Sequence, residues 1–268
     1  MLCDSHTHSR YSFDGHSTAR EMCLAALDAG VGTLVITDHY DIDGIMDGFY
    51  PAYDAAGAAA EIAAAKEEFA SRLSLYRGIE IGQPALRPEA ARAFLADNRF
   101  DFVIGSCHNL AGMPDFFFLN YTHMPQPLME DLYRRMLGEL CQHAAFPGIH
   151  SVAHLTYPLR YMHACGRMLD VQMFEAEFRR LFHVMTESGV ALEMNVKGMA
   201  RGDISPETER YIFRLYKDCG GTEVTVGSDA HTAAEIGGSV AAGMELLREI
   251  GFCSVRLPGE HGITHIKI

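Results

Sequence analysis

The sequence predicts an α/β fold in which parallel strands alternate with helices and close into a barrel. Seven short runs of β-branched and apolar residues are each followed by a segment with helix signals. This alternation is typical of right-handed βαβ units, which build a parallel sheet. No linker rich in proline, glycine or serine divides the chain, and its 268 residues can form one barrel core. A single domain over residues 1–268 is therefore expected.

The predicted strands share one plan, an apolar run that ends in polar side chains. In a parallel barrel these ends form one rim, and the loops that follow them carry the chemistry. The C-terminal residues 260–268 are expected to add an edge strand. The seven predicted strands cover residues 1–8, 32–39, 73–80, 100–108, 148–155, 190–195 and 222–231.

Helix signals occupy the intervals between the strands. Thr18 and Glu21 can form a capping box at the start of the first helix, and Gly30 can end it. Pro88 suits the first position of a later helix, and Ser205 precedes another that begins with proline. Alanine-rich composition or apolar residues at three- and four-residue spacing predict further helices at 54–70, 127–144, 170–188 and 233–250.

The composition limits the class of partner. A formal net charge of −13 disfavours nucleic acid, which requires a basic surface. A small anionic substrate remains compatible, since bound cations would reverse the local field. No apolar run is long enough for a membrane span, and no signal-peptide pattern is present. Seven scattered cysteines without a CxxC pattern indicate reduced thiols, so a cytoplasmic protein is expected.

Metal-ligand side chains gather at the predicted strand ends. His6 and His8 are two residues apart, as are Asp229 and His231, so each pair can point to one side of an extended chain. A set this large exceeds the coordination of one ion, but two or three ions could share it if Glu80 bridges them. Imidazole and carboxylate ligands without cysteine favour Zn, Mn or Fe. The nine candidate ligands are His6, His8, Asp14, His39, Glu80, His108, His154, Asp229 and His231.

Other polar residues near these ends have less specific interpretations. A single histidine at a strand end is more often an ordinary polar residue than a ligand. His16 could line the site without binding metal, and Asp4 could contact a ligand histidine or be an ordinary polar residue. Asp38 is expected to fix the loop beside His39, and His150 to lie in the core or face a helix. Surface or structural roles are expected for His123, His143, His163, His183, His261 and His265.

Seven motifs in order resemble the PHP (polymerase and histidinol phosphatase) family of trinuclear metallophosphoesterases, over roughly residues 3–235. The stand-alone histidinol-phosphate phosphatase branch is the most similar. The resemblance implies a distorted (β/α)7 TIM-like barrel and three divalent ions, Zn, Fe or Mn. The family often has histidine where Asp14 stands. The motifs are HTHSRYSFDGH, ITDH, GIEIG, GSCH, AHLTYP, EMN and GSDAH.

The resemblance also implies which residues hold each ion. The first ion would take His6, His8, Glu80 and Asp229. The second would share Glu80 and add His108 and His154. The third would take Asp14, His39 and His231.

The resemblance further implies hydrolysis of L-histidinol phosphate, a step of histidine biosynthesis, by a metal-bound hydroxide. Glu80, Asp229 and His231 would be catalytic, and Asp229 or a nearby histidine would protonate the leaving oxygen. Arg160 and Arg201 would bind the phosphate, with Lys197 competing for the second role. The residues alone indicate only a small phosphate ester.

Three alternatives remain open at this stage. The chain could act on nucleotide monoesters or diesters, on tyrosine phosphates, or could be a non-catalytic metal-binding module. The segment 109–128 is predicted to be an excursion over one face of the barrel. Its aromatic residues could form a lid or simply pack; they are Phe116, Phe117, Phe118 and Tyr121.

Overall fold

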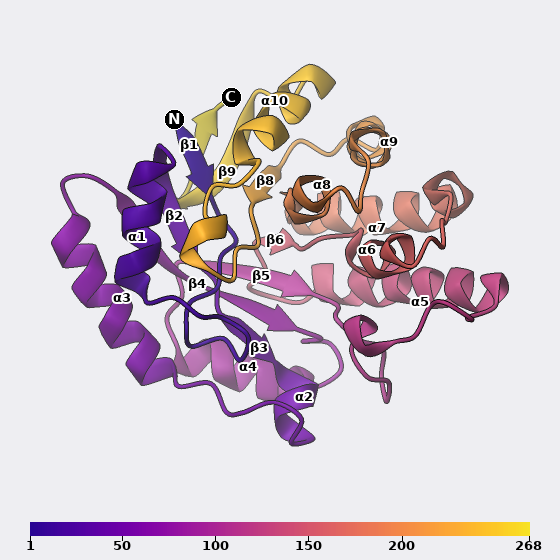
Figure 1. The fold of residues 1–268 in the computed structure, drawn as a ribbon, viewed down its shortest axis with the longest axis horizontal. Coiled ribbons are helices and arrows are strands. Elements are labelled where there is room, and N and C mark those ends of the chain that lie inside the picture. The colour runs from indigo at the N-terminus through magenta and orange to yellow at the C-terminus, as the bar shows by residue number, and fades with distance from the viewer.

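The computed structural model describes residues 1–268, and it has the parallel sheet that the sequence predicts (Figure 1). The seven expected strands pair in the order β1-β2-β4-β5-β6-β7-β8, and all these pairs are parallel. The strands are β1 (Leu2–Asp4), β2 (Val31–Ile36), β4 (Ser74–Gly82), β5 (Phe102–Ser106), β6 (Ser151–Val152), β7 (Ala191–Asn195) and β8 (Val224–Gly227).

Contacts between the first and last strands bring the sheet close to a closed barrel. The Ser5 N–H donates to the Val226 carbonyl at 3.0 Å, and the Asp229 N–H donates to the His6 carbonyl at 2.8 Å. Thr7 and Ala230 form an isolated parallel bridge just beyond. These bonds place the first and last ligand-bearing segments of the chain side by side.

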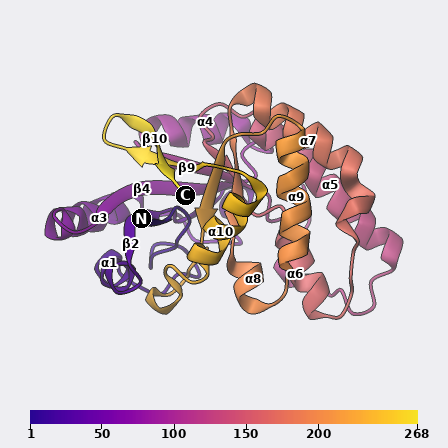
Figure 2. The same cartoon turned by 90° about the horizontal axis from the view of Figure 1, so that it is seen from above.

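The long helices lie where the sequence predicts them, outside the sheet. The capping box of Thr18 and Glu21 is present, and Ser205 accepts from the Thr208 N–H at the start of α9. Figure 2 shows α5, α7 and α9 ranged along one side of the barrel. The helices are α1 (Ala19–Asp28), α3 (Ala55–Phe69), α4 (Pro88–Asp97), α5 (Gln126–Ala144), α7 (Glu175–Ser188), α9 (Pro206–Asp218) and α10 (Val240–Ile250).

Short elements lie between several strands and the long helices. Those that follow β2, β6 and β7 carry loops at the rim, and two of the 3-10 turns fall inside the predicted helices 170–188 and 233–250. These elements are β3 (His39–Asp41), α2 (Ile42–Met46), α6 (Tyr157–Ala164) and α8 (Lys197–Arg201), with 3-10 turns η1 (Phe116–Phe118), η2 (Val171–Phe174) and η3 (Ala233–Glu235).

Two boundaries differ from the expectation. The predicted helix over 233–250 is interrupted, because Gly237 adopts a positive φ of 70° after the η3 turn and α10 begins only at Val240. The C-terminal residues do not add an edge strand to the barrel. They form an antiparallel hairpin of β9 (Ser254–Gly259) and β10 (Gly262–Lys267), a separate sheet.

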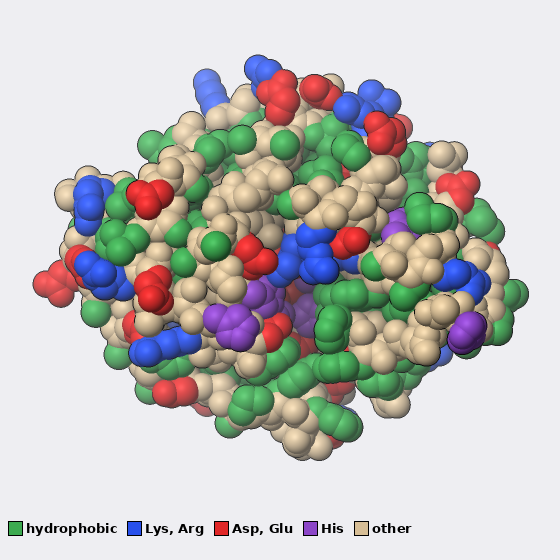
Figure 3. All heavy atoms as spheres, viewed as in Figure 1, with side chains coloured by type: hydrophobic (Ala, Val, Ile, Leu, Met, Phe, Trp, Pro, Cys, Tyr) green, Lys and Arg blue, Asp and Glu red, His purple; other side chains and the backbone are tan.

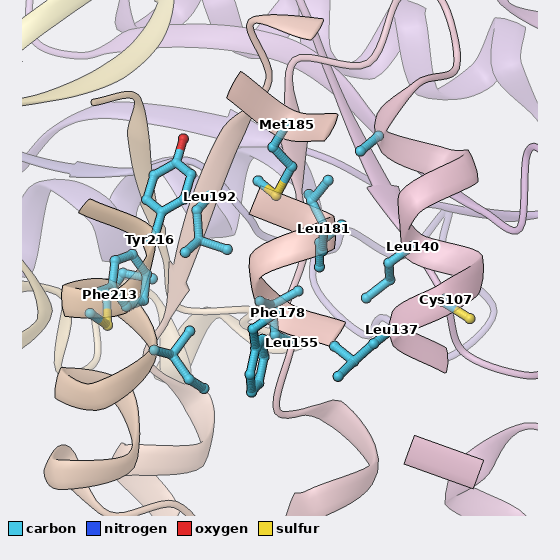
Figure 4. Packing of buried hydrophobic residues seen from close by; sticks show 14 of the residues in the cluster. Cys107, Leu137, Leu140, Leu155, Phe178, Leu181, Met185, Leu192, Phe213 and Tyr216 are labelled. Carbon is cyan, nitrogen blue, oxygen red and sulfur yellow. The ribbon is translucent and has the colours of Figure 1, made fainter. Parts of the chain in front are cut away.

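A continuous hydrophobic layer separates the sheet from the helices of one side. Phe178, Leu181 and Met185 of α7 are fully buried and lie in one cluster with Leu192 of β7 (Figure 4). We call the packing between the sheet and α5, α7 and α9 the hydrophobic layer. The structure has no helix that combines the length and apolar character required to span a membrane.

Candidate metal centre

Glu80, near the end of β4, is the centre of the polar cluster at the rim. Its side chain is fully buried, and imidazole nitrogens from four different segments surround its two oxygens. One oxygen faces the nitrogens that follow β5 and β6, and the other faces those that follow β1 and β2. The distances to Glu80 are 3.2 Å from His6 Nε2, 2.9 Å from His39 Nδ1, 3.1 Å from His108 Nε2 and 2.9 Å from His154 Nε2.

Asp229 forms the second anchor of the cluster, just after β8. Its Oδ1 lies 3.4 Å from His8 Nε2 and 3.6 Å from His231 Nδ1. Its backbone has a φ of 56°, a left-handed conformation that is uncommon outside glycine and typical of functional positions. Asp14 completes the rim, with its carboxylate 3.1 Å from His231 Nε2 and 3.7 Å from His39 Nε2. All nine candidate ligands therefore lie in one cluster.

Several polar atoms of this cluster are buried and make no hydrogen bond. A buried polar atom without a partner costs free energy, so native structures rarely tolerate many together. Divalent cations would supply the missing partners, and several groups of three residues have ligand atoms within 4.8 Å of one another. The unpartnered atoms are Nε2 of His6 and His8, Nδ1 of His39, Oε2 of Glu80, Oδ1 of Asp14 and Oδ2 of Asp41.

The electrostatics of the cluster also suit bound cations. Burial favours the neutral form of Glu80, but the rings of His6, His108 and His39 outweigh it and hold the pKa of Glu80 well below its ordinary value. Burial alone would lower the pKa of His6, but Glu193 and Glu80 raise it well above its ordinary value. The carboxylates thus attract positive charge into a largely buried site.

Two carboxylates that the sequence analysis did not single out orient the histidines. Glu193 of β7 lies 2.5 Å from His6 Nδ1 and also accepts from the His154 N–H at 2.8 Å. Asp41 lies 2.7 Å from His108 Nδ1. A carboxylate on the far nitrogen fixes ring orientation and tautomer in metal-binding histidines.

Gly227 leaves the space that this arrangement requires. A Cβ at this position would lie 2.3 Å from the His6 Cβ and 2.8 Å from Glu193 Oε1. The glycine of the GSDAH motif is therefore explained by close approach, not by a positive φ.

The expected phosphate-binding residues have different environments. Arg160 on α6 is buried, donating to Asp229 Oδ2 at 3.0 Å and to Asn195 Oδ1 at 2.7 Å, which leaves its Nε without a partner. Lys197 donates to the Asp229 carbonyl and lies 2.8 Å from His231 Nδ1, so its ammonium group mainly holds this loop. Arg201 is 63% exposed and pairs with Asp203.

A cleft opens over the cluster and exposes part of it to solvent. Figure 3 shows histidine side chains at the bottom of a hollow, with basic side chains and hydrophobic side chains at its edges. Arg160, Lys197 and Arg201 line the cleft, as do Phe117 and Phe118. The segment 109–128 thus contributes Phe117 and Phe118 to one wall of the cleft.

Some sequence expectations do not hold in this arrangement. His16 is exposed and does not line the cleft; only its backbone N–H donates to the His231 carbonyl. Phe116 and Tyr121 are core residues, so only half of the aromatic set faces the cleft. Asp4, for which two roles were open, accepts from the Ser228 and Gly237 N–H groups, and its carboxylate also contacts the backbone of His6.

Asp38 has the role expected for it, whereas His150 is half-buried in the loop before β6 and is not a core residue. Asp38 fixes the loop after β1, accepting from the Ser9 N–H at 2.6 Å and from Ser12 Oγ at 3.1 Å. His150 accepts from the Val103 N–H of β5 at 2.9 Å. His143 is fully buried.

Comparison with known proteins identifies several relatives. The chain is 29% identical over 266 residues to a probable histidinol-phosphatase of Deinococcus radiodurans, covering 93% of this chain and 94% of the relative. It is 25% identical over 261 residues to the histidinol-phosphatase of Lactococcus lactis, covering 93% and 91%.

Solved structures share the fold. Histidinol phosphate phosphatase from Lactococcus lactis, complexed with zinc, L-histidinol and phosphate, matches with a TM-score of 0.82 over 98% of both chains at 19% identity. A histidinol phosphatase from Listeria monocytogenes, described as putative, matches with a TM-score of 0.70 at 17% identity, over 89% of this chain and 98% of the other. A family model described as the PHP domain matches residues 4–197, well over half of the sequence. This chain therefore belongs to the PHP domain family.

Proposed function

We propose that this chain is a metal-dependent phosphomonoesterase that hydrolyses L-histidinol phosphate to L-histidinol and phosphate. The observation that carries the proposal is the cluster of nine ligand-type side chains, with unpartnered buried atoms, at the bottom of a cleft lined by Arg160. A phosphate ester is anionic. Metal ions in the cluster and the guanidinium group of Arg160 would both bind it through their positive charge. The names of the relatives in Deinococcus radiodurans and Lactococcus lactis point to the same ester.

We assign three divalent ions to the cluster. The first site consists of His6, His8, Glu80 and Asp229, the second of Glu80, His108 and His154, and the third of Asp14, His39 and His231. The groups whose ligand atoms lie within 4.8 Å include His6, His8 and Asp229 together, which supports the first site. Zinc, manganese and iron fit these nitrogen and oxygen ligands, and the related structure contains zinc. When bound, the ions supply an activated water and neutralise phosphoryl charge.

The protein side chains position the phosphate and set the protonation of the site. Arg160 has five N–H donors and uses two of them on Asp229 and Asn195, so others remain for phosphate oxygens. Burial would raise the pKa of Asp229, but Lys197, His8, His6 and Arg160 hold it well below its ordinary value. Asp229 therefore stays ionised, which suits a metal ligand and argues against it as the proton donor.

The wall of the cleft suits an organic group that is aromatic and cationic. Phe117, Phe118 and Tyr157 line the cleft beside Asp115, whose carboxylate accepts from the Tyr157 hydroxyl at 3.0 Å. Burial raises the pKa of Asp115. An ammonium or imidazolium group of the substrate would stabilise its charged form, so we assign Asp115 to recognition of the histidinol portion.

A phosphate-release assay tests the proposal. The metal-loaded protein is given histidinol phosphate, a nucleotide monophosphate, a dinucleotide and a phosphotyrosine peptide at equal concentrations. Histidinol phosphate is expected to have a kcat/KM at least about tenfold above the others, the difference that about 1.4 kcal/mol of selective binding produces. Preference for a nucleotide ester would instead assign the site to that substrate class. Full metal content without turnover of any ester would identify a non-catalytic module.

Replacing Asp115 separates substrate recognition from chemistry. Asp115→Asn is expected to raise the KM for histidinol phosphate while leaving hydrolysis of p-nitrophenyl phosphate, which has no cationic group, unchanged. Asp47→Asn is the matched control, because Asp47 is exposed and does not line this cleft. An equal loss with both esters would remove Asp115 from recognition of the cation.

A further inference from the structure

We call the nine candidate ligands around Glu80 the rim cluster, and a second group of metal-ligand side chains lies outside it. Cys107 directly follows β5, and Glu139 and His143 are one turn apart on α5. Their ligand atoms all lie within 4.8 Å of one another. None of the three lines the cleft, so they do not belong to the substrate site described above.

His143 is the unusual member of this group. Its side chain is fully buried, and neither ring nitrogen has a hydrogen-bond partner. Oε2 of Glu139 is also inaccessible and without a partner. Buried histidines normally satisfy at least one nitrogen, since an unpaired buried polar group destabilises the fold. Two such residues pointing to one place indicate that a partner belongs there.

The surroundings offer the ring of His143 no alternative partner, and the Glu139 carboxylate accepts only from the Ala111 N–H. Leu137 and Leu140 of α5 lie with Cys107 in one hydrophobic cluster (Figure 4). Cys107 Sγ makes only a weak contact of 3.3 Å to the Asn109 carbonyl. Burial, with a smaller effect of His108, lowers the pKa of His143 to about 3, so the imidazole is neutral, the form that binds metals.

We propose that Cys107, Glu139 and His143 form a separate site for one transition-metal ion, best suited to Zn²⁺. A thiolate, an imidazole and a carboxylate match zinc, and a water or the second carboxylate oxygen would complete a tetrahedron. The thiol proton is released to solvent when the ion binds. The site is structural, because it joins the end of β5 to α5 and has no access to the cleft.

The position of the site connects it to the rim cluster. Cys107 is next to His108, and an ion on the thiolate would hold this end of β5 against the helix. Loss of the ion should therefore loosen the segment that carries His108 without removing any residue of the rim cluster.

Cobalt substitution tests the proposal directly. The purified protein is stripped of metal and reloaded with Co²⁺, and the near-ultraviolet absorption is recorded. Thiolate ligation of Co²⁺ produces a charge-transfer band there, and the nine rim residues include no cysteine. The wild type is expected to show the band and to bind one ion per chain more than Cys107→Ser, in which the band disappears. His143→Leu should also lose the band.

Cys141→Ser is the matched control. Cys141 is also a buried cysteine on α5, but its Sγ contacts only the Leu137 carbonyl of its own helix. This variant should keep both the band and the full ion count. Absence of the band in the fully loaded wild type overturns the proposal, as does its persistence in Cys107→Ser. The wild-type spectrum by itself can overturn the proposal, even if a variant fails to fold.

Discussion

The rim cluster and the hydrophobic layer are both buried, but the first consists of polar side chains and the second of apolar side chains. In the rim cluster, buried carboxylates and imidazoles surround Glu80 and leave several polar atoms without hydrogen bonds. In the hydrophobic layer, Phe178, Leu181 and Met185 of α7 are fully buried among apolar side chains. The rim cluster lowers the free energy of unfolding unless cations are bound, whereas the hydrophobic layer raises it. Function and stability are thus separated between the ends of the strands and their outer faces.

Removing the central carboxylate of the rim cluster should have the largest effect. Glu80→Gln removes the negative charge and replaces one of the two oxygens that four histidines surround with an amide NH2 group, which cannot bind metal, so two ions should be lost. We expect phosphatase activity to fall by about 10³-fold or more, because the activated water depends on those ions. Metal analysis and kcat measurement check this. Glu187→Gln, an exposed carboxylate of α7, is the control. Unchanged ion content in Glu80→Gln would contradict the assignment.

A truncation in the hydrophobic layer should produce the opposite pattern. Phe178→Ala removes a fully buried ring and leaves a cavity, which typically lowers the free energy of unfolding by about 3–5 kcal/mol. The kcat per folded molecule should remain near that of the wild type. Urea unfolding and kinetics at a temperature below the transition measure both quantities. A selective loss of kcat without a loss of stability would show that the two regions are not separate.

Glu209 of α9 lies between the two regions. The pH dependence of the free energy of unfolding tests its contribution to stability. Burial raises its pKa from 4.5 to about 7, while Thr156 donates to it at 3.1 Å. The folded protein therefore holds a proton that the unfolded chain releases, so the wild type loses stability as the pH rises from about 4.5 through about 7. Glu209→Gln should reduce this loss by up to about 3 kcal/mol. Urea unfolding at pH 5 and pH 8 checks it; equal pH dependence in both proteins would refute it.

The two arginines of the cleft should differ in effect, since one is buried and the other exposed. Arg160→Lys keeps a charge but loses the planar fork, and we expect a roughly 10- to 100-fold increase in KM with the metal content retained. Arg201→Lys should change KM by less than about fivefold, because an exposed, solvated cation contributes little. Steady-state kinetics of both variants provide the comparison. The reverse ranking would place the phosphate at the outer edge of the cleft.

The arrangement of strands could be predicted because its signals are local. Apolar runs that end in HTH, ITDH, GSCH and GSDAH mark parallel strands, and parallel strands place their carboxyl ends on one rim. Six of the nine candidate ligands lie at these ends, namely His6, His8, His39, His108, Asp229 and His231. The helix start at Val240 and the separate C-terminal hairpin could not be predicted from such signals. Their boundaries depend on the conformation of Gly237 and on the pairing of β10 with β9 in a separate sheet.

The sequence by itself determined the alternation of elements, the ligand types and their place at the strand ends, because spacing along one strand decides which way side chains point. Only the tertiary structure decided that Glu193 orients His6, 187 residues away, and that Asp41 orients His108. It also decided that Lys197 holds the loop of Asp229 while Arg160 keeps free donors. These roles depend on pairs that the packing of separate strands brings together, and no local pattern records such distances.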